Sequence, residues 1–189
     1  MMAGQTREFV KRFARNRGAV VGVVILAVVV LVALTAPLLA PGDPWRMVQR
    51  PFLEPFTNPA HPLGTDTLGR DILTGIIYGA QISLLVGLVS TLVALSIGVT
   101  IGALAGYYGG IVDDALMRVT EFFQTIPNFA LAIVLVAIFQ PSTTSVIVAI
   151  GVVSWPPVAR LVRGEFLSLR SREFVQAAVV IGQSNRTII

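Results

Sequence analysis

The sequence predicts an all-α, polytopic membrane protein, and three observations support this fold class. Of the 189 residues, 54% are hydrophobic and only 13% are charged, whereas an average soluble domain is about 25% charged. The mean hydropathy is +0.80. Residues 18–42, 72–112 and 122–159 contain no Asp, Glu, Lys or Arg. Because a helix needs about 20 residues to cross the hydrocarbon layer, these three stretches predict about four membrane spans.

The first stretch predicts one span over residues 19–40, which Pro37 and Pro41 end. A cleaved signal peptide is the competing interpretation, but its apolar region is usually only about 7–15 residues long. We therefore favour an uncleaved signal anchor. In the second stretch, residues 72–81 mix polar, aromatic and glycine residues and predict an interfacial segment. The second span is predicted over residues 82–106.

The third stretch is interrupted in its middle by Gln-Pro-Ser-Thr-Thr over residues 140–144. This interruption predicts two spans, over residues 122–139 and 145–159. Pro156 and Pro157 are expected to cut the end of the last helix, because proline has no backbone N–H and clashes with the preceding turn.

The distribution of Lys and Arg predicts the orientation, because basic residues beside short spans stay in the cytoplasm. With the N-terminus inside, eleven basic residues are cytoplasmic and three are outside. Residues 43–71 would then face outward, and the tail from Arg160 would face inward. The cytoplasmic set is Arg7, Lys11, Arg12, Arg15, Arg17, Arg118, Arg160, Arg163, Arg170, Arg172 and Arg186.

The second predicted span carries a ladder of small residues. Gly98, Gly102 and Gly106 recur every four residues, with Ala94 in register before them, so they share one helix face. Small residues let membrane helices approach closely. The ladder therefore favours a helix-packing seam, within the chain or between subunits, although glycine is also common in membrane helices.

Composition excludes several kinds of chemistry. The chain has no cysteine and a single histidine, His61, which removes disulfides, thiol catalysis and histidine metal clusters. We expect His61 to be an exposed loop residue and expect no metal or cofactor. The low charge content also argues against a nucleic-acid-binding arm. No span has a charge near its centre, and Glu121 and Gln124 are the nearest polar candidates.

Residues 43–71 contain five prolines and predict an irregular connector. Thr65 or Asp66 is expected to cap a short helix there, with Asp66 and Arg70 paired four residues apart. A catalytic pair of Asp66 and Asp71 is disfavoured, because residues five apart do not share a helix face well and no nucleophile accompanies them. The sequence therefore predicts no enzyme site.

The tail predicts a helix, a glycine turn and a second helix. Ser171 is expected to cap the first helix, with Glu173 in its first turn. Phe174, Ala178 and Ile181 fall on one apolar face. Gly182 then provides the left-handed stop, and Ser184 can cap the second helix. Both a close-packing protein partner and the lipid surface fit this amphipathic face.

Three blocks of sequence, taken in their order along the chain, resemble a known family. The first is His-Pro-Leu-Gly-Thr-Asp-Thr-Leu-Gly-Arg-Asp over residues 61–71, followed by residues 78–87. The second covers residues 102–110 with Asp113 and residues 116–118. The third runs from Ser-Trp-Pro-Pro over residues 154–157 into residues 172–182. Together they resemble the C-type permease subunit of bacterial ABC importers for dipeptides, oligopeptides and nickel.

The resemblance implies a type I ABC importer permease fold with six spans, of which about four are present here. It implies an N-terminal part over residues 1–60, a permease core over 61–159 and an incomplete coupling loop over 160–189. The chain therefore resembles a C-terminally truncated copy. The last block is similar to the family's EAA loop, although Gln176 stands where its consensus has glutamate. The implied coupling residues are Arg172, Glu173, Gln176, Ala177, Ala178 and Gly182.

By resemblance, the protein forms half of a translocation path in a bacterial inner membrane. The implied partners are a B-type permease, two cytoplasmic ATPase subunits, an extracytoplasmic substrate-binding protein and membrane lipid, with no nucleic acid. The chain has no GxxxxGK[ST] loop and is not expected to bind nucleotide itself. A non-transporting membrane scaffold or an inactive fragment is the alternative interpretation, and a membrane-embedded hydrolase ranks last.

Overall fold

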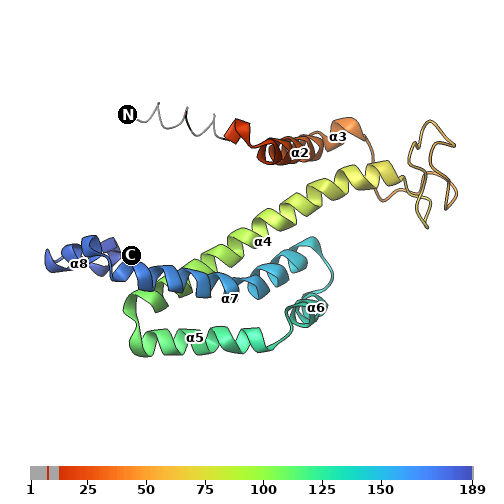
Figure 1. Cartoon of the computed structure of the whole chain (residues 1–189). Coiled ribbons are helices and arrows are strands. Elements are labelled where there is room, and N and C mark those ends of the chain that lie inside the picture. The colour runs from red at the N-terminus through yellow and green to blue at the C-terminus, as the bar shows by residue number, and fades with distance from the viewer. Residues whose placement is uncertain (1–7, 9–12, 189) are drawn as a thin grey trace. The chain divides into compact units, whose positions relative to one another are not determined.

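The computed structural model describes residue 8 and residues 13–188, and every regular element in this part of the chain is a helix (Figure 1). The all-α fold class predicted from the sequence is confirmed. Contacts divide the chain into two compact units, Met1–Leu85 and Val86–Ile189. Three helices are long and apolar enough to span a membrane, or four if one bent pair counts as a single span. Arg7, Lys11 and Arg12, which contribute to the predicted orientation, lie outside the described residues.

In the first unit, α2 covers Arg17–Leu34 and is followed by the short α3, Ala36–Leu39. Asn16 caps α2, because its side-chain oxygen accepts a hydrogen bond from the amide of Ala19 at 3.2 Å. The predicted single span over residues 19–40 is therefore interrupted near its end. Thr35 interrupts it, and its hydroxyl donates to the carbonyl of Leu31 at 2.7 Å.

The helix α4, Ile72–Tyr108, runs for 37 residues without a break. Residues 72–81, predicted as an interfacial segment before a span over residues 82–106, form the first turns of this same helix, so the two predicted parts are not separated by a break. Asp71 explains the early start, because its Oδ2 accepts hydrogen bonds from the amide of Thr74 at 2.8 Å and from the Thr74 hydroxyl at 2.6 Å. This cap satisfies first-turn donors, and Gly75 and Gly79 then continue as ordinary helical residues.

In the second unit, α5 covers Gly110–Thr125 and α6 covers Asn128–Phe139. These two helices meet at 84°, so the span predicted over residues 122–139 is not one continuous helix but contains a sharp bend near its start. Ile126 and Pro127 cause the bend. Proline disfavours a helical conformation in the residue before it, and Ile126 is extended, with φ −85° and ψ 128°.

The helix α7, Thr143–Arg170, is followed by α8, Glu173–Val180, and by α9, Asn185–Ile188. The prediction that Pro156 and Pro157 end the last span near residue 159 is wrong, because α7 continues through both prolines to Arg170. Packing explains the difference. Pro156 is fully buried, and Trp155 beside it packs against Phe123 of α5, with ring centroids 5.4 Å apart.

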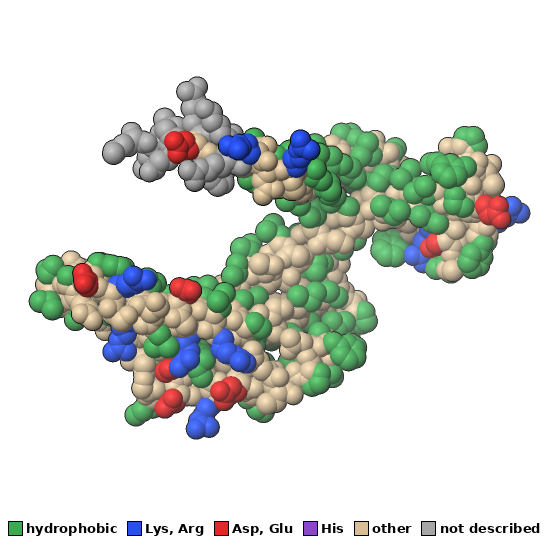
Figure 2. Space-filling view, viewed as in Figure 1, with side chains coloured by type: hydrophobic (Ala, Val, Ile, Leu, Met, Phe, Trp, Pro, Cys, Tyr) green, Lys and Arg blue, Asp and Glu red, His purple; other side chains and the backbone are tan. Residues whose placement is uncertain are grey.

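The second unit has a small core where α4 and α7 meet. Ala94 of α4 and Trp155 and Ala159 of α7 are buried there. Ile97, Ile101 and Phe123 pack around them. Side chains of Lys, Arg, Asp and Glu gather over α5, the C-terminal half of α7 and α8, while α6 is apolar (Figure 2). The unit therefore has one charged end and one apolar end, as expected of a protein with one end in water.

Candidate functional site: a helix-packing seam, an ion pair and an exposed terminal helix

The glycine ladder of α4 lies against α7 of the same chain. A Cβ atom added at Gly98 would lie 2.6 Å from the Cβ of Val158, and one at Gly106 would lie 2.6 Å from the Cβ of Phe166. At Gly102 the added atom would overlap the backbone oxygen of Ala159. Real Cβ atoms essentially never show such distances. The structure therefore places all three predicted packing glycines where α4 and α7 approach too closely for any side chain.

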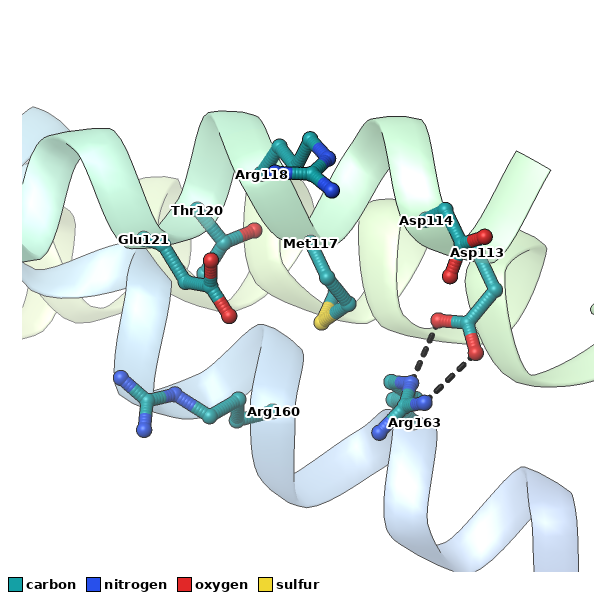
Figure 3. A pocket seen from close by; sticks show the side chains of 8 residues that line it. All are labelled: Asp113, Asp114, Met117, Arg118, Thr120, Glu121, Arg160 and Arg163. Carbon is teal, nitrogen blue, oxygen red and sulfur yellow. Dashed lines mark hydrogen bonds and ion pairs between the residues drawn. The ribbon is translucent and has the colours of Figure 1, made fainter. Parts of the chain in front are cut away.

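An ion pair joins α5 to α7 (Figure 3). Arg163 donates from Nε to Oδ1 of Asp113 at 2.5 Å and from Nη2 to Oδ2 at 2.6 Å. The Asp113 side chain is 11% exposed and the Arg163 side chain is 34% exposed. Such a two-pronged pairing is geometrically specific and stronger than a neutral hydrogen bond. α7 is therefore held on one side by the glycine seam and on the other by this pair.

Sequence reasoning named both residues but did not pair them, because they are 50 positions apart. One pattern in the sequence does indicate that Asp113 needs a partner. Asp113, Met117, Thr120 and Gln124 recur at the spacing of a single helix face. A charged residue on a face that also carries a fully buried Thr120 must find a partner on the neighbouring element.

A cleft of about 290 Å³ lies beside the ion pair, between α5 and α7. Six of the eight residues that line it are charged (Figure 3). Glu121 projects into it from α5 and Arg160 from α7. The full lining is Asp113, Asp114, Met117, Arg118, Thr120, Glu121, Arg160 and Arg163.

The predicted coupling residues gather on and around α8. Arg172 is the N-cap residue and is extended, with φ −75° and ψ 143°, and Glu173 lies in the first turn. The predicted cap by Ser171 is wrong, since its hydroxyl donates back to the carbonyl of Ser168 at 2.8 Å. An acidic residue in the first turn is still favourable, because the helix dipole is positive there.

The apolar face predicted for this helix is exposed to solvent in the chain. Phe174 is 67% exposed and Ile181 is 78% exposed, while Ala178 is half-buried. Gly182 follows the helix with φ +83°, as the predicted left-handed stop requires. The second predicted helix begins at Asn185, and the hydroxyl of Ser184 pairs with that of Thr187 at 2.8 Å.

A groove of about 520 Å³ runs between α8, α9 and the C-terminal end of α4. The predicted coupling residue Gln176 lines it, together with Val179, Tyr108 and Arg170. Across the groove, the Tyr107 hydroxyl donates to Oδ1 of Asn185 at 2.7 Å. The terminal helices are therefore tied directly to α4.

The connector of the first unit is held by side-chain hydrogen bonds. The prediction that His61 is an exposed loop residue is wrong in its exposure, although His61 does lie in the connector. Its Nδ1 lies 3.1 Å from Oδ1 of Asp71, and its side chain is 18% exposed. The hydroxyl of Thr65 donates to the carbonyl of Arg50 at 2.7 Å and accepts from the amide of Leu53 at 3.0 Å. The connector is thus an ordered irregular segment.

Asp66 does not cap a helix as predicted. Its Oδ1 accepts from the amides of Leu68 at 2.8 Å and Arg70 at 2.9 Å, which closes a turn. The hydrogen bond from the Arg70 amide is the main cause that lowers the pKa of Asp66 below its ordinary value. The expected pairing of Asp66 with Arg70 is present but long, at 3.9 Å.

Asp71 is a structural cap of α4. Its burial acts to raise its pKa, but hydrogen bonds from the Thr74 hydroxyl, the Thr74 amide and His61 outweigh this effect and leave the pKa below its ordinary value. Among the described residues, no group of three or more His, Cys, Asp or Glu side chains could hold a metal ion.

This arrangement defines a helical membrane protein in which α4, α5 and α7 of the second unit are held together and α7 is followed by an exposed amphipathic helix. Two family models match the chain. Residues 98–189 match the binding-protein-dependent transport system inner membrane component. Residues 4–59 match the N-terminal membrane domain of oligopeptide transport permease C.

Curated relatives agree with this assignment. The dipeptide permease DppC of Haemophilus influenzae is 39% identical over 93% of this chain and 61% of its own length. The glutathione permease GsiD of Pectobacterium atrosepticum is 38% identical over 97% of this chain and 61% of its own. The oligopeptide permease OppC of Escherichia coli K12 is 39% identical over 95% of this chain and 60% of its own length.

The chain belongs to this family of inner membrane transport components, of the OppC/DppC type. It spans about 60% of the length of these relatives. The family comprises multi-pass inner membrane proteins of transport systems rather than enzymes.

Proposed function

We propose that this chain acts as a permease subunit of an ATP-driven importer, forming half of the translocation path and receiving mechanical force through α8. One observation carries the proposal. An exposed apolar helix, α8, stands at the end of α7, which is itself clamped to α4 and α5. Exposed contiguous apolar surface marks interaction sites, and packed elements transmit motion as rigid bodies.

The clamping matters because force applied to α8 must reach the membrane helices. The ladder of Gly98, Gly102 and Gly106 leaves α4 and α7 in backbone contact. The pair of Asp113 and Arg163 ties α5 to the same helix. A displacement of α8 is therefore expected to carry α4, α5 and α7 together, rather than bend one helix alone.

The proposed partners follow from this mechanism. Two cytoplasmic ATPase subunits supply the force, one of them contacting α8, and a B-type permease supplies the other half of the path. A binding protein delivers cargo from the side of residues 43–71. The proposed orientation places the N-terminus and α8 in the cytoplasm, in agreement with the predominance of Lys and Arg on that side.

The proposed coupling residues are Arg172, Glu173, Gln176, Ala177, Ala178 and Gly182. The test is Ala178→Trp in the full-length permease, because Ala178 is half-buried at the base of the exposed face. We expect bulk at this position to displace the ATPase, so that uptake falls while ATPase activity persists. Ala115→Trp, on an exposed position of α5, is the matched control.

Co-purification of the variant with its ATPase gives the second readout. Normal uptake with Ala178→Trp would contradict the coupling role of α8. If the wild-type permease captured no ATPase and supported no uptake, the scaffold interpretation would hold instead.

We propose peptides as the cargo. The relatives compared above are named for the transport of dipeptides, oligopeptides and glutathione, which all contain amide bonds and ionised ends. Nickel is the alternative cargo. In proteoliposomes that contain the complete system, excess unlabelled dipeptide should abolish uptake of labelled dipeptide, and Ni²⁺ should not. Inhibition by Ni²⁺ alone would reverse this assignment.

A further inference from the structure

We propose that the charged cleft between α5 and α7 contacts the cargo peptide by its two ionised ends, with Glu121 receiving the ammonium group and Arg160 the carboxylate. This inference rests on the proposed function, because it assumes that the chain carries peptides. It assigns a cargo contact to residues at the charged end of the second unit (Figures 2 and 3).

The cleft holds charges that are not used within the chain. Asp113 and Arg163 satisfy each other. Within the described part of the chain, Glu121 and Arg160 form no hydrogen bond or ion pair, although they project into the cleft from opposite helices (Figure 3). Two unpaired groups of opposite sign therefore face a shared space of about 290 Å³.

Arg160 is not at the free end of its helix. α7 continues for ten residues beyond it, to Arg170, which corresponds to ~15 Å at 1.5 Å per residue. The cleft therefore lies along α7, at the charged end of the unit, rather than at the helix terminus. Water and a solute can reach it there, because Glu121 and Arg160 are exposed.

The charge pattern selects the class of ligand. Beyond the internal pair, the lining has two acidic residues, Asp114 and Glu121, and two basic residues, Arg118 and Arg160. A neutral site with separated charges complements a ligand that is itself neutral overall with separated charges, such as a peptide with free termini. The guanidinium group suits a carboxylate because it can donate two parallel hydrogen bonds.

A second observation on the same helix indicates unmet capacity for hydrogen bonds. Gln124 lies one turn beyond Glu121 on α5, and its buried Oε1 is without a hydrogen-bond partner among the described residues. Buried polar atoms in native proteins are normally satisfied. Gln124 does not line the cleft, so this acceptor adds polar character one turn beyond Glu121 and is not itself a contact with the ligand.

The cleft is partly open, because Glu121 and Arg160 are both exposed at its edge. A transport path needs contacts that are favourable enough for entry and weak enough for release. We therefore expect a low-affinity site that is occupied during transit.

The test uses the absence of cysteine from this chain. Met117, which lines the cleft, is replaced by cysteine in the full-length permease. The permease is assembled with its partner permease and ATPases, made cysteine-free at reactive positions, in proteoliposomes without binding protein. The rate at which a methanethiosulfonate reagent modifies this cysteine is measured as dialanine is added.

We expect dialanine to slow modification saturably, by about threefold at a concentration of about twice its dissociation constant. N-acetyl-dialanine and dialanine amide should protect less, because each lacks one charge. With Glu121→Gln, the free and the acetylated peptide should protect the cysteine equally. With Arg160→Gln, the free and the amidated peptide should protect it equally. Each substitution should weaken protection by dialanine about tenfold, the effect of losing one charge-assisted hydrogen bond.

Glu165→Gln is the matched control, since Glu165 is exposed on α7 and does not line the cleft. It should leave protection unchanged. Equal protection by free and doubly blocked peptides, or no protection at all, would overturn the cargo contact. If the same assembly with binding protein still imports dialanine, the proposed function stands without this inference; loss of uptake in the wild-type system would defeat the proposed function itself.

Discussion

Replacement of Gly102 by alanine tests the seam between α4 and α7. The added Cβ would overlap the carbonyl oxygen of Ala159, and it would lie 2.8 Å from the Cβ of Val162 and 3.0 Å from the amide nitrogen of Arg163. Two of these atoms are backbone, so no side-chain rotation can relieve the contact. The helices must separate, and such overpacking typically costs about 1–3 kcal/mol.

An opposing effect must be included in the magnitude. Alanine favours a helix over glycine by about 1 kcal/mol, so the net effect of Gly102→Ala is about 0–2 kcal/mol of destabilisation. Gly87→Ala is the matched control, because Gly87 lies in α4 and an added Cβ would meet nothing within 4 Å. It should stabilise by about 1 kcal/mol. The two variants should therefore differ by about 1–3 kcal/mol.

Thermal unfolding of the detergent-solubilised full-length permease measures this difference. At about 2–4 °C for each kcal/mol in a protein of this size, the midpoint of Gly102→Ala should lie several degrees below that of Gly87→Ala. Equal midpoints, or a more stable Gly102→Ala, would refute the reasoning that backbone contact at this position holds α4 to α7.

Two further predictions concern single acidic residues. Asp113→Asn should destabilise the permease by about 1–3 kcal/mol, because it leaves half-buried Arg163 without its charged acceptor. Chemical denaturation measures this change in the free energy of unfolding. The control Glu165→Gln should change it by less than about 0.5 kcal/mol. For Asp71, the lowered pKa means that the cap of α4 is fully stabilising above the ordinary value of 3.8 and is lost as the pH falls below it. The Thr74 amide of the wild type should therefore lose protection from hydrogen exchange below this pH, whereas that of Asp71→Asn should show no such change. The same pH dependence in both proteins would contradict the assignment of Asp71 as the cap of α4.

The fold class and the helix, glycine turn and helix of the tail were accessible from the sequence because both rest on local patterns. Charge-free stretches locate apolar helices whatever their neighbours are. The turn at Gly182 requires only a residue that tolerates a positive φ. The pair of Asp113 and Arg163 was not accessible in this way, because 50 residues separate its members and only the packing of α5 on α7 brings them together. The same holds for His61 and Asp71, where the cap of α4 recruits the histidine.

The prolines show most clearly where local rules end. Pro127 and the pair Pro156 and Pro157 carry the same local signal, yet the first marks a bend of 84° and the second lies inside a continuous helix. Proline removes hydrogen-bond donors in both places, so the difference must come from what the surroundings contribute. Pro127 is exposed, whereas Pro156 is fully buried beside Trp155 in the core. Packing of one side of α7 against α4 and α5 offsets the lost hydrogen bonds there. This allows α7 to continue unbroken towards α8, as the proposed transmission of force along it requires.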